Sequence, residues 1–263
     1  KYLKNILNVK YAKKPQRWML FMYRMCYSLH YNMEQTLRVI LFDMLKERYS
    51  DKYTIDSLGM CRNDKELTQK MKDIGSCPDW YKERDKNMHH LFSYDTAVNC
   101  SMHYKFIIEF ENTWNENEYG YWSEKLLNGI YSYGIPVFFG WKNIGKIFNK
   151  KRFIHCDVPT QIINEMREYK KYVDRKAAEG PKRDQYIDGL LYGLRKNISG
   201  IELFMGKCID KIITIENNKT LYYDMLTQSI LINNKIDGSI LDPNRIGNQI
   251  RNAMKIAKSH LIT

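Results

Sequence analysis

The sequence lacks the patterns typical of a zinc site, a carboxylate metal site or a membrane span. It contains no Cys-x-x-Cys pair, no paired-histidine spacing and no Asp-x-Asp motif, so no metal-binding motif is indicated. The best apolar run, Trp18 to Leu29, is too short to cross a membrane and has Arg24 in its middle, which favours a buried strand. A signal peptide is also absent. Because the chain begins with Lys1 rather than Met, we expect it to be cut from a longer protein or processed, so an upstream membrane anchor stays open.

The composition is that of a globular domain with an excess of positive charge. Of the 263 residues, 44% are hydrophobic and 27% charged, which argues against a disordered chain. The net charge of +12 fits either a phosphate-bearing partner or a general compositional bias; the bias is favoured because the lysines form no dense basic block. Six cysteines could form disulfides, but a chain of this length can stabilise its own core. We therefore predict reduced cysteines in an intracellular, cytoplasmic protein.

Alternating strands and helices predict an α/β fold with a parallel sheet. Residues 1–15 are polar and basic, and we interpret them as a linker or lead-in to one domain, 16–263. This domain opens with a strand over Arg17–Met25, a helix over Met33–Arg48 and a strand over Tyr53–Leu58. The later predicted elements are a helix at Asp64–Ile74, a strand at Tyr104–Phe110, a helix at Ser123–Tyr133, and strands at Ile135–Phe139 and Phe153–Cys156.

The remainder of the chain is predicted to be mainly helical. Helical periodicity is present over Thr160–Lys176, Arg183–Lys196, Ile201–Thr214 and Leu221–Leu226. An amphipathic helix over Pro243–Ala257 follows, with proline in its first turn.

Polar side chains gather where the strand at 104–110 ends and the next helix begins. In an open α/β sheet, ligands bind at the carboxyl ends of the strands, against helix N-termini. Asn112, Tyr121, Glu124 and Lys125 all fall in this zone. A helix that begins at Ser123 would offer free N–H groups and a positive dipole end to a phosphate, and Lys125 adds a full charge. Glu124 could accept hydrogen bonds from a diol such as ribose.

The motifs of this segment resemble those of the α1,3/α1,4-fucosyltransferase family. In the family's order they are Phe110-Glu111-Asn112-Thr113, Tyr121-Trp122-Ser123-Glu124-Lys125 and Ile135-Pro136-Val137-Phe138-Phe139-Gly140, with Phe153-Ile154 in place of the last strand and Leu37-Arg38-Val39 upstream. Trp122 departs from the family, which has a small or β-branched residue there. The resemblance implies a Rossmann-like, GDP-fucose-binding domain, the donor-binding half of a two-domain GT-B glycosyltransferase. Residues 158–205 have no counterpart in the family and would form a helical insertion.

The resemblance also implies a role for each of five residues. Arg38 and Lys125 would neutralise the donor diphosphate and, with Glu124, act in catalysis. Asn112 and Tyr121 would line the nucleotide pocket, and Glu124 would hold ribose or fucose hydroxyls. The implied reaction is an inverting transfer of L-fucose from GDP-fucose to a glycan or glycoprotein hydroxyl, in α linkage. No metal or other cofactor is expected, because the two cations would stabilise the leaving GDP.

Other interpretations of these residues and of the chain stay open. A surface ion pair, helix capping and core packing are the ordinary roles of such residues. Glu109 and Glu111 would share one face of the strand, so a carboxylate metal pair is a less favoured alternative. The sequence offers no convincing general base. The resemblance implies one in an upstream acceptor domain, the alternative being an acceptor site rebuilt from 158–205; Glu111 and the loop acids are fallback candidates. We predict that His89-His90 lies in a loop or is partly buried, and forms no metal site.

The alternative functions are an inverting glycosyltransferase that uses another sugar nucleotide, a non-catalytic lectin-like remnant and, more remotely, a nucleic-acid-binding module. The net charge and the many aromatic residues support the last of these, but no nucleic-acid-binding motif is present. We expect neither nucleic acid nor a direct membrane span among the chain's interactions.

Overall fold

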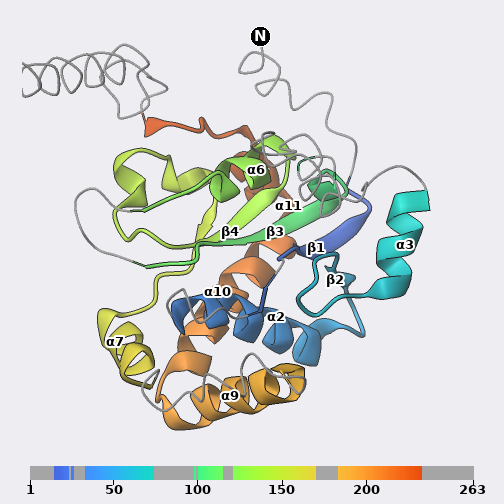
Figure 1. Cartoon of the computed structure of the whole chain (residues 1–263). Helices are drawn as coiled ribbons and strands as arrows, with labels where there is room; N and C mark the ends of the chain where they lie inside the picture. Colours follow the sequence, from blue (N-terminus) through green and yellow to red (C-terminus); the bar gives the residue numbers. More distant parts are fainter. Residues whose placement is uncertain are drawn as a thin grey trace, which may run out of the picture.

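A five-stranded parallel sheet forms the centre of the molecule (Figure 1). The computed structural model describes residues 15–23, 25–26, 33–73, 98, 100–114, 121–169 and 183–232. The strand order is β2-β1-β3-β4-β5, and all neighbouring strands are parallel. The predicted α/β class, with a parallel, Rossmann-like sheet, is therefore confirmed. The strands are β1 (Arg17–Phe21), β2 (Ile55–Ser57), β3 (Tyr104–Phe110), β4 (Ile135–Phe139) and β5 (Ile154–His155).

Helices pack against both faces of this sheet (Figure 1). On one face, the main core includes apolar residues of α2 (Thr36–Tyr49), α7 (Thr160–Tyr169), α9 (Arg183–Asn197) and α10 (Ile201–Glu216). The other face carries α6 (Lys125–Tyr131) and α3 (Lys65–Asp73), each with a smaller apolar cluster. The remaining elements are α11 (Lys219–Thr227) and the short 3-10 helices η2 (Met33–Gln35), η3 (Ile144–Lys146) and η4 (Lys150–Arg152).

Strand β3 lies in the middle of the sheet and is buried on both faces. Phe106, Ile108 and Phe110 point into the main core, whereas Ile107 belongs to the cluster beside α3. Glu109 points to the same face as Ile107, because its Cγ lies 3.2 Å from the position that a Cβ on Gly129 of α6 would take. An inner parallel strand covered on both sides explains the nearly continuous apolar run of this segment.

The predicted elements are largely present, with shifted ends. The bounds of β3 and β4 are those predicted. Strand β1 ends at Phe21 instead of Met25, because the chain then turns to place the Tyr23 side chain over the end of β3. Helix α6 begins at Lys125 instead of Ser123, because the N–H and hydroxyl of Ser123 bind the Glu111 carboxylate. The helix predicted from Met33 begins with a 3-10 turn.

The helices predicted after residue 158 are present over the described residues as α7, α9, α10 and α11. None of the described helices is long and apolar enough to cross a membrane. The assignment of 158–205 as an insertion and of 16–263 as one domain stays a prediction. The predictions for residues 1–14, for 74–97 with His89-His90, and for the helix at Pro243–Ala257 fall outside the described residues.

The described cysteines are disulfide-bonded, so the prediction of reduced cysteines is wrong. Cys26 pairs with Cys61, Cys156 pairs with Cys208, and Cys100 is also disulfide-bonded. The sequence could not show these pairs, because their partners are far apart in the chain and come together only in the fold. Cys26 and Cys61 follow the neighbouring strands β1 and β2, and their Cα atoms lie 4.9 Å apart, within reach of a disulfide.

Candidate functional site

The order of the strands places the candidate site at the carboxyl ends of β1 and β3. The chain crosses from β1 outward to β2 and then returns to β3 on the other side, so these two neighbours form the switch point of the sheet. Open α/β sheets bind ligands in the crevice outside this point. Tyr23 follows β1, and Glu111 and Asn112 follow β3, so polar residues occupy this edge.

Arg38 is held at this edge in a buried position. From α2, its guanidinium donates to Oδ1 of Asn112 (2.8 Å), to the Met25 carbonyl (2.6 Å) and to Oε1 of Gln35 (3.2 Å). The guanidinium also stacks over the Tyr23 ring at 4.2 Å from the ring centre. Burial lowers the pKa of Arg38 to about 10, against the opposing attraction of Tyr23 and Glu111. The guanidinium therefore stays charged at neutral pH. Its Nε is buried and has no hydrogen-bond partner among the described residues.

Tyr23 fixes the end of β3 beneath Arg38. Its hydroxyl accepts a hydrogen bond from the Phe110 N–H (2.6 Å) and lies 2.9 Å from the Ile108 carbonyl, to which it can donate. Burial raises the pKa of Tyr23 well above its usual value, so the hydroxyl keeps its proton. The loop after β1 is thereby tied to the strand that carries Glu111 and Asn112.

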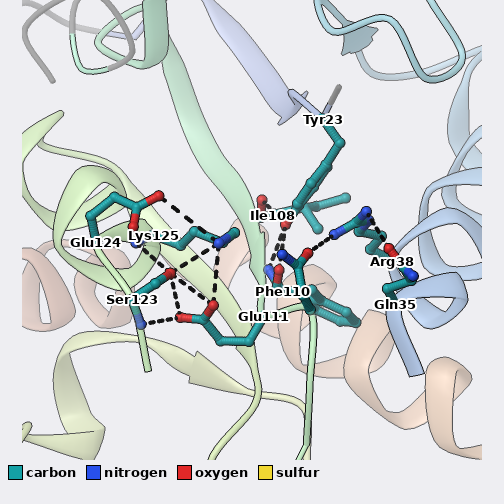
Figure 2. Close-up of polar contacts among 10 residues, drawn as sticks. Tyr23, Gln35, Arg38, Ile108, Phe110, Glu111, Ser123, Glu124 and Lys125 are labelled. Carbon is teal, nitrogen blue, oxygen red and sulfur yellow. Dashed lines mark hydrogen bonds and ion pairs between the residues drawn. The ribbon is translucent and has the colours of Figure 1, made fainter. Parts of the chain in front are cut away.

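Lys125 lies on the other side of Glu111, at the start of α6 (Figure 2). Its Nζ lies 3.2 Å from Oε2 of Glu111, 2.9 Å from Oγ of Ser123 and 3.9 Å from Oε1 of Glu124. Glu111 is fully buried and accepts hydrogen bonds from the Ser123 N–H (2.7 Å) and hydroxyl as well. Burial acts to lower the pKa of Lys125, but the neighbouring Glu111 and Glu124 outweigh it, so the pKa is raised. The ammonium is firmly charged.

Glu109 is a second buried carboxyl on the same face. Burial raises its pKa well above the usual value; Lys125 opposes this effect, and Glu111 and Glu124 add to it. Glu109 therefore holds its proton to a higher pH than an ordinary glutamate. The two carboxyls share one face, as the sequence predicted, but no group of three His, Cys, Asp or Glu side chains suited to a metal occurs within the described residues.

The structure brings the five predicted site residues to one edge of the sheet, in two groups. Arg38 and Asn112 form the first group, and Lys125 and Glu124 form the second. Glu111 lies between the two cations and attracts both (Figure 2). Tyr121, with 45% of its surface exposed, precedes the second group and interacts electrostatically with Lys125. The Ser123 N–H, predicted to be free for a phosphate, is instead bonded to Glu111.

Sequence reasoning missed Tyr23, Gln35 and Ser123 as parts of this site, and it treated Glu111 only as a possible base or metal ligand. Ser123 and Glu111 both lie inside the motifs, which was the available signal. Their pairing depends on how the chain returns to β3 before α6, and the motif spacing does not contain that information.

The fold and the site together define a doubly wound α/β domain with a cationic edge at the switch point of its sheet. The chain belongs to glycosyltransferase family 10, since the model of this family's fucosyltransferase C-terminal domain matches residues 25–180, more than half of the chain.

Two curated relatives have the same modest similarity. The α-(1,3)-fucosyltransferase FucT of Helicobacter pylori is 28% identical over 126 residues, which cover 46% of this chain and 24% of the relative. The putative fucosyltransferase R654 of Acanthamoeba polyphaga mimivirus is 28% identical over 172 residues, covering 65% of this chain and 24% of the relative. In each case the match spans about a quarter of the relative's length.

Solved structures are similar at a lower level. A crystal structure of α1,3-fucosyltransferase with GDP-fucose has a TM-score of 0.44 and 17% identity, over 89% of this chain and 42% of that one. A second crystal structure of α1,3-fucosyltransferase, with GDP, has a TM-score of 0.33 and 20% identity, over 81% of this chain and 50% of that one. These scores are too low to carry an argument, so the description of the fold relies on the sheet itself.

Proposed function

We propose that this chain binds GDP-fucose and forms the donor-binding half of a GT-B enzyme that transfers L-fucose to a glycan hydroxyl with inversion. Membership of glycosyltransferase family 10 supports the reaction class. The observation that carries the proposal is a pair of cations, the buried Arg38 and the half-buried Lys125, at the switch point of the sheet. A sugar nucleotide brings its diphosphate to such a place.

In this reaction the acceptor oxygen forms a bond to the anomeric carbon of fucose while the bond from that carbon to the β-phosphate oxygen breaks. The electron pair of the broken bond leaves with GDP, and the hydroxyl proton passes to a base. Arg38 and Lys125 would stabilise the negative charge that develops on GDP. The two cations would thereby take the place of a metal ion. Asn112 orients Arg38, and Glu124 and Tyr121 would face the ribose and the nucleotide.

Neither buried carboxyl of β3 is suited to act as the base. Glu111 already accepts from Ser123 and Lys125, and burial raises the pKa of Glu109 well above its usual value. We propose that the base and the acceptor site belong to a separate acceptor domain. The disulfides favour an oxidising compartment over the cytoplasm predicted from the sequence.

Calorimetry with GDP-fucose, GDP-mannose, a UDP-sugar and a short oligonucleotide tests the proposal. We expect GDP-fucose to bind most tightly, and Lys125→Met to weaken it by about tenfold or more, since a charged contact is lost. A chelator should leave binding unchanged. Preference for another sugar nucleotide would contradict GDP-fucose as the donor. Oligonucleotide binding with a steep salt dependence would favour the nucleic-acid alternative.

The matched control is Lys105→Met. Lys105 is also a half-buried lysine paired with a glutamate, since its Nζ lies 2.7 Å from Oε2 of Glu216 and its side chain is 19% exposed, against 16% for Lys125. It lies at the amino end of β3, away from the site. Equal binding losses in both variants would show a general loss of structure and would contradict the assignment of Lys125.

A further inference from the structure

Lys125 owes both its place and its charge to a fixed carboxylate behind it. An ammonium group has three donors, and the described residues use two of them, one on Glu111 and one on Ser123. The third is available to a ligand at the carboxyl edge of the sheet. The direction of that donor is set by the two bonds already made, so the partners of Lys125 decide where it can bind.

Glu111 is anchored more firmly than an ordinary surface glutamate. Its own N–H donates to the Phe139 carbonyl (2.8 Å), which continues the pairing of β3 with β4 beyond the strand end. Its side chain packs on Gly140, where a Cβ would lie only 2.7 Å from the Glu111 Cγ. Glycine at this position therefore makes room for the carboxylate. Full burial and three donors then fix its two oxygens.

Ser123 completes the arrangement. Its N–H and its hydroxyl both bind Glu111, and its Oγ accepts from Lys125 Nζ at 2.9 Å. One residue thus links the carboxylate to the ammonium and also sets the point at which α6 can begin. The serine, the glutamate and the lysine form a single hydrogen-bonded unit.

We infer that Glu111 and Ser123 are positioning residues, which hold the Lys125 ammonium in place and in its charged state for the diphosphate of the donor. This inference rests on the proposed function. It gives Glu111 a role through Lys125, instead of a role as base or metal ligand, and it explains why a buried site that must attract an anion contains a carboxylate.

The charges around Lys125 single out Glu111. The ionisable groups that face the ammonium are Glu109 and Glu111 from β3, and Tyr121 and Glu124 from the segment before α6. Burial raises the pKa of Glu109 well above its usual value, and Glu124 lies at the longer distance of 3.9 Å with a third of its side chain exposed. Without Glu111, the largest of the groups that raise the pKa of Lys125 against burial would be lost, and Glu124 and Tyr121 would remain.

The test compares GDP binding by Glu111→Gln and wild type between pH 7 and pH 9. Glutamine keeps the shape but removes the charge, so we expect affinity to fall about tenfold at pH 7. The loss should grow as the pH rises, because the variant's lysine would lose its proton at a lower pH than the wild-type lysine. The ionisation of GDP affects both proteins equally, so the ratio of their GDP affinities at each pH reports on the protein alone.

Two further variants keep the test decisive. Glu216→Gln removes the carboxylate that pairs with Lys105 at the amino end of β3, and it should leave GDP affinity and its pH dependence unchanged. Ser123→Ala should weaken binding at all pH values, and Ser123→Thr should restore it, because the hydroxyl is kept. If Glu111→Gln does not fold, as judged by circular dichroism, the comparison of Ser123→Ala with Ser123→Thr tests the inference.

The outcomes separate this inference from the proposed function. If Lys125→Met weakens GDP binding but Glu111→Gln and Ser123→Ala bind like wild type at every pH, the positioning role is overturned and the donor site stands. If Lys125→Met binds GDP like wild type, the donor site itself is overturned.

Discussion

Two buried arginines with similar environments differ in one respect that matters for function. Arg38 and Arg152 are 3% and 4% exposed, and burial lowers the pKa of each to about 10. Arg152 donates to the carbonyls of Gly134 and Ile130, at the amino end of β4. Arg38 lies at the opposite edge, beside Asn112. Burial and charge alone therefore do not identify a site residue. Its position at the carboxyl or the amino end of the strands is the distinguishing feature.

For Arg38 and Arg152 we predict similar effects on the free energy of unfolding but different effects on GDP affinity. Arg38→Met and Arg152→Met should each lower the free energy of unfolding by about 1–3 kcal/mol, because buried carbonyl acceptors lose their donors. Only Arg38→Met should also weaken GDP binding, by more than tenfold. Urea unfolding and calorimetry on both variants measure the two effects. Weaker GDP binding in Arg152→Met would argue against a role for Arg38 in contacting the donor.

Glu109 predicts a pH dependence of stability with a definite sign. Its pKa is raised in the folded state, so folding takes up a proton once the pH exceeds the usual carboxyl range. Stability from this group is complete in acid and falls as the pH rises towards the raised pKa. Glu109→Gln should therefore gain about 1 kcal/mol or more at pH 8, and little at pH 4.

Urea unfolding at several pH values measures this difference. The control is Glu66→Gln, which makes the same change on the exposed surface of α3. A gain for Glu109→Gln that is equal at pH 4 and pH 8 would mean that folding does not raise the pKa of Glu109.

The sequence predicted much of the site at the level of single residues. The motif order placed Asn112, Glu124 and Lys125 at one strand end, and Arg38 was added from an upstream motif. The structure brings these residues to one edge, while their roles stay predictions. The link from Lys125 through Ser123 to Glu111 could not be predicted, because the same residues would allow a helix to begin at Ser123 with its N–H free.

At the scale of elements, the close contact of α6 with the sheet sets the position of Lys125. Gly129 of α6 faces Pro136 of β4, where an added Cβ would lie 2.9 Å from the proline Cγ. The proline ring is rigid, so Gly129→Ala should push α6 away from the sheet. We expect a loss of about 1–3 kcal/mol in the free energy of unfolding and weaker GDP binding.

Gly189 of α9 provides the control for this prediction. A Cβ at Gly189 would meet nothing within 4 Å, so Gly189→Ala should stabilise the helix by about 0.5–1 kcal/mol and leave binding unchanged. Thermal unfolding of both variants distinguishes the two glycines. A stabilised Gly129→Ala variant would show that α6 has room to adjust.

The elements that the sequence predicted best are those that the sheet buries on both sides. Strands β3 and β4 consist of apolar runs with polar or glycine boundaries, and both bounds were correct. Strand β1 was predicted too long, because Met22 and Tyr23 continue the apolar run into the loop that closes over β3. Hydrophobicity alone cannot distinguish a buried loop residue from a strand residue.

At the scale of the whole molecule, the two described disulfides join different parts of the fold. Cys156–Cys208 links the end of β5 to α10, over 52 residues of sequence. Cys26–Cys61 links the loops after β1 and β2 at the edge where Arg38 lies. The residue before Cys26 is Met25, whose carbonyl accepts from Arg38 at 2.6 Å. The Cys156–Cys208 disulfide therefore supports the fold, and the Cys26–Cys61 disulfide also supports the site.

We expect removal of the two disulfides to have different consequences. The double variants Cys26→Ser/Cys61→Ser and Cys156→Ser/Cys208→Ser should each lose about 2–4 kcal/mol of stability, because each opens a closed loop of the unfolded chain. Under conditions where both are folded, only the first should weaken GDP binding, since the Met25 carbonyl is no longer held against Arg38. Calorimetry at a temperature well below both unfolding transitions measures this. Equal GDP affinities in the two variants would show that Asn112 and Gln35 suffice to hold Arg38, and that the disulfide at the site only supports the fold.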